Sequence, residues 1–141
     1  MALCIIIHNS ILLFAFIANV AFTVQATSDL PDVLDKVKSL VEHPDFTLTN
    51  PNRCRSLISV FSGNAAHFHA DGGDGYKFLG EIISKTDKLN PQLSSRMGGA
   101  LIRWKRYSEK RGASMKAELQ KLAGMKPISN DLFEVVSRGL K

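Results

Sequence analysis

Apolar residues recur every three or four positions from residue 30 onward, which is the spacing of side chains on one face of a helix. The first such stripe covers residues 33–41. We expect Asp29 to cap this helix and Pro31 to lie in its first turn, where a missing backbone N–H costs no hydrogen bond. Because a proline pushes the residue before it out of the helical region, His43 and Pro44 mark the end of the helix.

Five further helices follow from the same spacing, separated by turn residues. Gly63 closes the second helix, and residues 64–75 then form a loop in which glycines supply backbone freedom. Asn90 opens the fourth helix, whose apolar stripe continues as far as Trp104. The expected ranges of the five helices are 51–63, 76–86, 90–104, 108–122 and 129–140.

The pattern contains no strand and no hairpin signal, so it predicts an all-α fold. The connections are short, and short connections make helices that follow one another in sequence neighbours in space. We expect antiparallel short helices stacked as helical pairs over residues 27–141, in a superhelical, solenoid-like arrangement, although no repeat of fixed period is visible. Gly98 and Gly99 each cost about 1 kcal/mol inside a helix, which predicts that a neighbouring helix packs close to them.

Residues 1–26 form an apolar leader of different character. No Lys, Arg, Asp or Glu precedes Asp29, and residues 11–24 are nearly continuous apolar sequence. That length suits the core of a signal peptide, and Val24-Gln25-Ala26 offers a cleavage site, although the basic residues usual before such a core are missing. Two other interpretations stay open: a truncated or misjoined chain, and a membrane anchor, which needs about 20 apolar residues.

Charge is concentrated in the second half of the chain. The 141 residues carry a net charge of +5, and 45% are apolar, which suits one packed domain. From Arg96 to Lys121 there are eight basic and two acidic residues, and Arg96, Arg103 and Lys110 recur every seven positions on one side of the fourth helix. Such a block is typical of a solvated face or of a surface for a protein partner. A small basic protein that binds polyanions is the alternative, but no nucleic-acid module signature occurs, so no nucleic acid is expected.

No set of side chains matches a known catalytic or metal-binding pattern. A zinc peptidase of the H-E-x-x-H type needs two histidines one turn apart on a helix, and none of the four histidines is followed by Glu. His67, His69 and Asp71 only faintly resemble a metal cluster, and we expect these histidines to hydrogen-bond the backbone of the loop. Glu81 and Asp87 are expected on the solvated side of the third helix. We therefore predict no catalytic residue and no metal ligand in this chain.

Cysteine has no catalytic role in this interpretation. Cys4 and Cys54 are the two cysteines, which are too few for a disulfide framework. Cys54 lies in the apolar stripe of the second helix, where we expect a small buried residue.

Gln92 and Arg96 are the candidates for a binding role. They stand one helical turn apart, so both project from the same side at the start of the fourth helix. An amide and a guanidinium in this arrangement could hold a substrate carboxylate or a backbone carbonyl. The alternative is a hydrogen bond on the helix surface or an interdomain contact.

Four blocks of sequence together resemble one part of a known enzyme family. They are FTLTNPNR at residues 46–53, FHADGGDGY at residues 68–76, NPQLSSR at residues 90–96 and RWKRY at residues 103–107. In combination they resemble the bacterial-type alanyl aminopeptidases (aminopeptidase N), which are zinc gluzincins, over residues 25–141. The resemblance implies the helical C-terminal domain, which folds over the catalytic domain and covers the active-site cavity.

The resemblance also implies how the chemistry is divided. Zinc and catalysis belong to another domain of the full-length family, so this chain would hold no cofactor and is expected to be inactive alone. Gln92 and Arg96 match the family's N-P-Q-x-x-S-R segment, whose Gln and Arg can face the substrate cavity on the prime side. The implied partners are the catalytic domain of an aminopeptidase and, only in a whole enzyme, a peptide substrate; no membrane partner is expected. Localisation would be cytoplasmic or organellar, or secreted if residues 1–26 act as a signal peptide.

Two positions depart from the family pattern. Gly72 stands where the family commonly has the acidic residue of D-G-x-G-Y, and Cys54 replaces a residue that is usually aliphatic or aromatic. The first departure puts the local hydrogen bonds of this loop in question.

Overall fold

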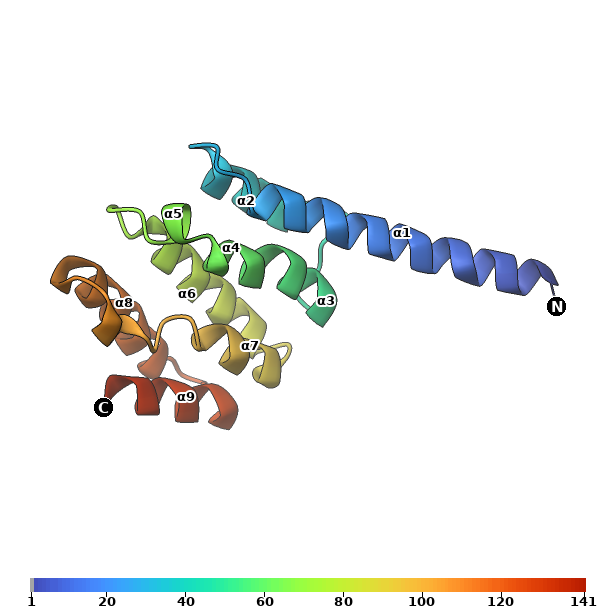
Figure 1. Cartoon of the computed structure of the whole chain (residues 1–141). Helices are drawn as coiled ribbons and strands as arrows, with labels where there is room; N and C mark the ends of the chain where they lie inside the picture. The colour runs from blue at the N-terminus through green and yellow to red at the C-terminus, as the bar shows by residue number, and fades with distance from the viewer. Residues whose placement is uncertain (1) are drawn as a thin grey trace. The chain divides into compact units, whose positions relative to one another are not determined.

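The computed structural model (Figure 1) describes residues 2–141, with side chains from Leu13 onward. The chain forms two compact units. One unit extends to Phe61 and the other covers Ser62–Lys141. The described backbone consists of helices joined by turns and short irregular segments. No strand occurs among these residues, which confirms the all-α prediction. Within the part of the chain that the structure describes, no helix is both long enough and apolar enough to cross a membrane.

In the first unit, one long helix packs on three shorter elements. The long helix contacts each of the other three, of which the last two follow one another without a break. The elements are α1 (Ala2–Ala26), α2 (Val33–Val41), α3 (Pro51–Cys54) and the π-helical segment η1 (Arg55–Ser59). The buried apolar residues of this unit are Phe22, Ala26, Val33, Val37, Phe46, Cys54, Leu57, Ile58 and Phe61.

The start of α2 differs from the prediction. Asp32, and not Asp29, occupies the N-cap position, so Pro31 lies ahead of the helix instead of in its first turn. The Ser28 hydroxyl accepts a hydrogen bond from the Leu30 N–H at 3.3 Å, and this local turn delays the start of the helix. The end of α2 falls before Pro44, as the sequence predicts.

The second expected helix begins where the sequence places it but is irregular inside. The Asn50 side chain accepts hydrogen bonds from the N–H groups of Asn52 and Arg53, at 3.0 and 3.3 Å, and so caps α3. Over η1 the hydrogen bonding widens, and the Val60 N–H donates to the Arg55 carbonyl five residues earlier. The chain continues as α4 (Val60–Gly63), inside which the division between the two units falls.

The second unit is built from four main helices and two short segments. In this unit α6 packs on α7 and α8, and α9 packs on α7 and α8, so each main helix touches two others. The elements are α5 (Ala65–Phe68), α6 (Asp74–Asp87), α7 (Pro91–Gly98), the 3-10 segment η2 (Trp104–Arg106), α8 (Glu109–Ala123) and α9 (Asn130–Leu140). Its largest fully buried side chains are Phe68, Tyr76, Leu79, Ile83, Leu101, Met115, Leu119 and Leu132.

Residues 64–75, expected as a loop, contain the helical turn α5. This turn places Phe68 in the core, where its ring meets the Tyr76 ring edge-on with centroids 5.2 Å apart. The first turn of α6 comes so close that a Cβ on Gly75 would lie 2.6 Å from the Phe68 carbonyl oxygen. Gly73 before it has φ 68°, a left-handed conformation that favours glycine. Gly75 therefore allows the close contact between α5 and α6, and Gly73 allows the turn between them.

The fourth expected helix is shorter than predicted. It ends at Gly98 instead of continuing to Trp104, because two consecutive glycines weaken it and the chain then turns into η2. Leu101 is nevertheless fully buried. A helix packs close to Gly98, as predicted. A Cβ on Gly98 would lie 3.5 Å from the Leu132 side chain on α9.

The last two helices follow the prediction closely. α8 starts after Ser108, although the Ser108 side chain makes no capping hydrogen bond, and its inward residues are buried as expected. The Ser129 hydroxyl caps α9 by accepting from the Leu132 N–H at 3.2 Å. Gly139 near the end of α9 packs against the turn after α7, where a Cβ would lie 2.5 Å from the Ile102 methyl carbon Cγ2.

Candidate functional site

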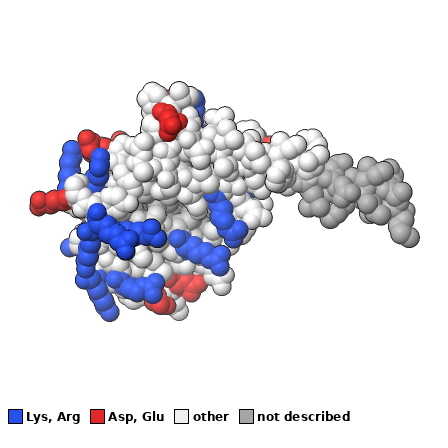
Figure 2. Space-filling model, viewed as in Figure 1, with Lys and Arg blue, Asp and Glu red and all other residues white. Residues whose placement is uncertain are grey.

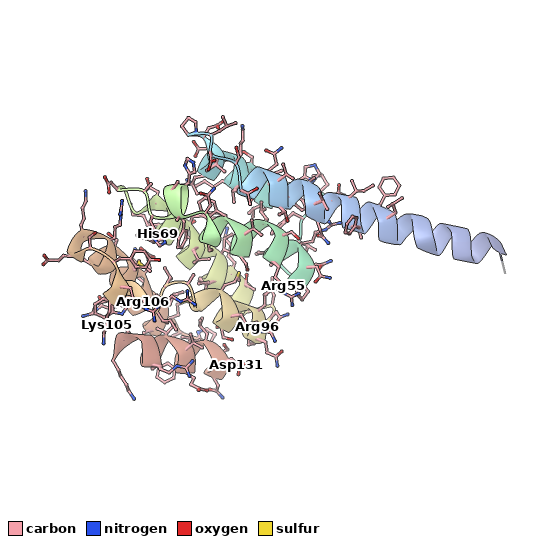
Figure 3. All side chains as sticks on the ribbon, in the orientation of Figure 1. Arg55, His69, Arg96, Lys105, Arg106 and Asp131 are labelled. Atoms are coloured by element: carbon pink, nitrogen blue, oxygen red, sulfur yellow. The ribbon has the colours of Figure 1, made fainter. Side chains whose placement is uncertain are left out.

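Gln92 and Arg96 lie one turn apart on the exposed side of α7, as the sequence predicts. Figure 3 labels Arg96 on this helix. The start of this helix is defined by Asn90, whose side chain accepts a hydrogen bond from the Leu93 N–H at 3.1 Å, and by Pro91 in the first turn. Within the described part of the chain, the side chains of Gln92 and Arg96 make no hydrogen bond or ion pair and are exposed. Both polar groups therefore remain available for an external partner.

The opposite side of α7 is anchored by Ser94 and Asp87. The Ser94 hydroxyl, fully buried, donates to the Asp87 carboxylate at 2.7 Å. The same carboxylate accepts from the backbone N–H of Ser129 at 2.9 Å and from its hydroxyl. One carboxylate at the end of α6 thus joins α7 and the first turn of α9, and it holds the helix that carries Gln92 and Arg96.

Asp87 was expected on the solvated side of its helix, and this expectation is wrong. Its side chain is 5% exposed. Burial by itself raises the pKa of a carboxyl group, but the hydrogen bonds from Ser129 and Ser94 outweigh burial and leave the pKa of Asp87 below its usual value. Glu81, expected on the same side, is exposed as predicted.

The basic residues after Arg96 do not form one stripe, which corrects the seven-residue prediction. Because α7 ends at Gly98, Arg103 lies in the turn before η2 and Lys110 lies in the first turn of α8. Figure 3 shows Arg96 on α7, with Lys105 and Arg106 on the segment that follows. In Figure 2, Lys and Arg side chains crowd the lower left of this face with few acidic ones among them.

Part of this basic charge is already neutralised or engaged. Arg111 pairs with Asp71 at 3.3 Å, and Lys121 pairs with the nearly buried Glu118 at 2.6 Å. The ammonium groups of two further lysines lie over the Trp104 ring, at 5.4 and 4.9 Å from its centroid, in favourable cation–π geometry. These lysines are Lys105 and Lys116. The use of this surface for a polyanion stays a prediction.

Trp104 joins the turn after α7 to the end of the chain. Its indole N–H donates to the Gly139 carbonyl on α9 at 2.8 Å. A Cβ on Gly112 of α8 would lie 2.8 Å from the Trp104 carbonyl oxygen, so the backbone of α8 approaches the same turn closely. Trp104 therefore has a structural role that the stripe in the sequence did not reveal.

His69 belongs to an aromatic cluster and does not bond the loop backbone as expected. Its Nδ1 atom lies 2.8 Å from the Tyr76 hydroxyl, and its ring stacks on Tyr107 with centroids 4.2 Å apart. Burial, and secondly the positive charge of Arg111, lower the pKa of His69, so the neutral ring is favoured. This cluster was not predictable from local sequence patterns, because Tyr107 is 38 positions away from His69 along the chain.

The described residues contain no group of three or more His, Cys, Asp or Glu side chains that could hold a metal ion. Asp71, the third member of the faint cluster, is paired with Arg111 instead of lying with the histidines. Cys54 is fully buried, as predicted, and burial raises the pKa of its thiol to about 11, so the thiolate is scarce at neutral pH. The side chain of Cys4 lies outside the described residues.

Comparisons with known proteins agree on one family. A family model described as a domain of unknown function (DUF3458_C) with ARM repeats matches residues 15–141. Over 84% of its length the chain is 47% identical to aminopeptidase N of Escherichia coli (strain K12) and 40% identical to aminopeptidase N of Caulobacter vibrioides. It is also similar to the crystal structure of Legionella pneumophila aminopeptidase A in complex with aspartic acid, with a TM-score of 0.82 and 33% identity over 87% of this chain. The chain spans 14% of the length of each of these proteins.

Proposed function

Because the chain belongs to the DUF3458_C family of ARM-repeat domains, we propose that it works as the helical part of a zinc-dependent alanyl aminopeptidase and adds substrate contacts to a catalytic domain that it does not contain. It corresponds to the C-terminal helical domain of aminopeptidase N. The observation that carries the proposal is the 47% identity with the Escherichia coli enzyme, which extends over 84% of this chain and falls within 14% of that enzyme.

In this proposal the zinc ion and the water it activates belong to the catalytic domain. The titratable side chains described in this chain do not suit a zinc centre. His69 is held by Tyr76 and Tyr107, and Asp71 is paired with Arg111. The contribution of this chain is therefore to bind and orient a peptide, and to cover the cavity in which hydrolysis takes place.

Gln92 and Arg96 are the residues we propose for contact with the peptide. A guanidinium can donate two parallel hydrogen bonds to a carboxylate, and an amide can both donate to and accept from a peptide group. Both side chains lie on the exposed face of α7 without a hydrogen-bond partner among the described residues, while the Ser94–Asp87 hydrogen bond holds the other face. This rigid support suits binding groups, which must be held in position before the substrate arrives.

A domain exchange tests the proposal. Residues 15–141 replace the matched segment of Escherichia coli aminopeptidase N, and hydrolysis of alanyl peptides is measured. We expect an active chimera. Arg96→Ala in the chimera should lower kcat/KM for peptides by about tenfold, which corresponds to the loss of one charge-assisted hydrogen bond.

Arg138→Ala, which removes an exposed arginine from α9, is the matched control and should leave kcat/KM within about twofold. An inactive chimera that folds and retains zinc would contradict the proposed domain role. If the chimera is active and neither Arg96→Ala nor Gln92→Ala changes kcat/KM, the domain role is supported and the proposed peptide contacts of these two residues are wrong.

A further inference from the structure

α7 carries Gln92 and Arg96 but is only eight residues long, which is about two helical turns. Helices shorter than about 12 residues are marginally stable in water by themselves, so the direction of their side chains depends on the elements they pack against. The main neighbours of α7 are α6 and α9. The way in which these two helices hold α7 therefore determines where Gln92 and Arg96 point.

α9 touches α7 through an apolar contact near the end of α7. A Cβ on Gly98 would lie 3.5 Å from the Leu132 side chain and 3.6 Å from that of Val135, so the two helices approach closely there. The hydrophobic effect that favours this contact is non-directional. It brings α7 and α9 together but constrains the rotation of α7 about its own axis less than a hydrogen bond does.

A hydrogen-bonded link that runs through α6 sets that rotation. At the start of α9, the Ser129 N–H donates to the Asp87 carboxylate at 2.9 Å, and the Ser129 hydroxyl donates to it as well. On α7, the buried Ser94 hydroxyl donates to the same carboxylate at 2.7 Å. Ser94 is two positions, or about 200°, from both Gln92 and Arg96, so it projects from the opposite side of the helix. A rotation that breaks the link therefore also redirects both binding side chains.

We propose that Ser129 is a positioning residue for peptide binding: through the Asp87 carboxylate it sets the rotation of α7, and with it the direction of the two binding side chains. Ser129 lies 33 positions after Arg96 in the sequence, where the local pattern predicts a helix cap. In this role it acts from the far side of α7 and makes no contact with the peptide. The inference rests on the proposed function and gives the start of α9 a part in it.

The same chimera with Escherichia coli aminopeptidase N tests this role. Ser129→Asp keeps a good helix cap but places a second carboxylate beside Asp87, which breaks the link by charge repulsion. We expect it to raise KM for alanyl peptides about fivefold and to change kcat by less than about twofold, because binding groups are displaced while the catalytic domain is intact. Ser129→Thr keeps a hydroxyl at this position and is the matched control, which should leave KM within about twofold.

A second arm distinguishes an effect through the binding residues from a general loss of stability. In a chimera that already carries Gln92→Ala and Arg96→Ala, adding Ser129→Asp should change KM by less than about twofold, because no binding side chain is left to redirect. A rise of about fivefold in both backgrounds would overturn the proposal. Ser94→Ala removes the hydroxyl at the other end of the link and should reproduce both results. It takes the place of Ser129→Asp if that variant loses the wild-type circular dichroism or its zinc.

The outcomes separate this inference from the proposed function. If Arg96→Ala lowers kcat/KM but neither Ser129→Asp nor Ser94→Ala raises KM, the peptide contacts are supported and the positioning role of Ser129 is wrong. If Gln92→Ala and Arg96→Ala both leave kcat/KM unchanged, the proposed contacts are wrong and the positioning role is wrong with them. A folded chimera that is inactive contradicts both.

Discussion

Asp87 shows how a single residue can connect three helices. It accepts hydrogen bonds from Ser94 on α7 and from Ser129 at the start of α9, while it stands at the end of α6. Removing a buried acceptor leaves its donors without partners, and this is more harmful than the modest net value of one hydrogen bond suggests. The position of the proposed binding residues on α7 therefore depends on Asp87.

We predict that Asp87→Ala lowers the free energy of unfolding by about 2 kcal/mol, because the part-buried N–H and hydroxyl of Ser129 lose their acceptor and the buried Ser94 hydroxyl keeps only the Pro91 carbonyl. Urea unfolding followed by circular dichroism measures the change. Glu81→Ala, which removes an exposed carboxylate from the same helix, should change the free energy by less than about 0.5 kcal/mol. Equal effects of the two substitutions would contradict the role given to Asp87.

The lowered pKa of Asp87 also predicts how stability depends on pH. The folded chain binds the proton of this carboxyl group more weakly than the unfolded chain, whose pKa is 3.8. The stabilisation by Asp87 is therefore complete above that pKa and is lost as the pH falls through the lower pKa of the folded state. The free energy of unfolding of the wild-type chain should therefore fall more steeply than that of Asp87→Ala as the pH falls below about 4. Parallel curves would show that another group controls the acid response.

At the scale of elements, α1 is the helix for which the sequence and the structure favour different interpretations. From the sequence, residues 1–26 are a signal-like leader, a truncated or misjoined segment, or a membrane anchor, and the boundary at residue 26 stays a prediction. In the structure Phe22 and Ala26 are buried in the first unit, and the family model begins at residue 15. These observations favour a role for residues 15–26 in the folded unit.

We predict that Phe22→Ala lowers the free energy of unfolding by about 3–4 kcal/mol, as expected for a buried phenylalanine that leaves a cavity. Gln25→Ala on the exposed side of the same helix is the control and should have an effect below about 0.5 kcal/mol. Thermal and urea unfolding give both values. If Phe22→Ala behaves like the control, residues 15–26 contribute nothing to stability and the interpretation as a removable leader gains weight.

α7 ends earlier than the apolar spacing of the sequence predicts. The apolar spacing of Leu93, Met97, Leu101 and Trp104 continues past the helix end, because the turn that follows still directs Leu101 into the core. Spacing alone does not distinguish a helix from a helix followed by such a turn. The pair Gly98-Gly99 carried the relevant signal, since it weakens the helix at that point.

At the scale of the whole molecule, the proposed division between a helical part and a catalytic part has a direct consequence. We predict that the isolated chain does not hydrolyse alanine p-nitroanilide, with or without added zinc, because its described residues do not suit a zinc centre. Escherichia coli aminopeptidase N assayed at the same concentration is the positive control. Turnover that rises with the amount of purified chain and disappears with a chelator would contradict the prediction.

The sequence by itself determined the main helices after residue 30, some of their ends, most of their buried apolar positions and the family. These features depend on local chemistry: apolar spacing, capping residues such as Asn50 and Ser129, and short motifs that keep their order along the chain. The burial of Cys54 was predictable for the same reason.

Only the tertiary structure decided which polar groups meet. Asp87 and Ser129 are 42 positions apart, and no local pattern encodes such a contact, because it depends on how α6 and α9 pack. The same holds for the stacking of His69 on Tyr107 and for the face of α1 that packs against its own unit. In a helix that is apolar on all sides, the sequence contains no periodic difference between that face and the others, so packing alone reveals which face it is.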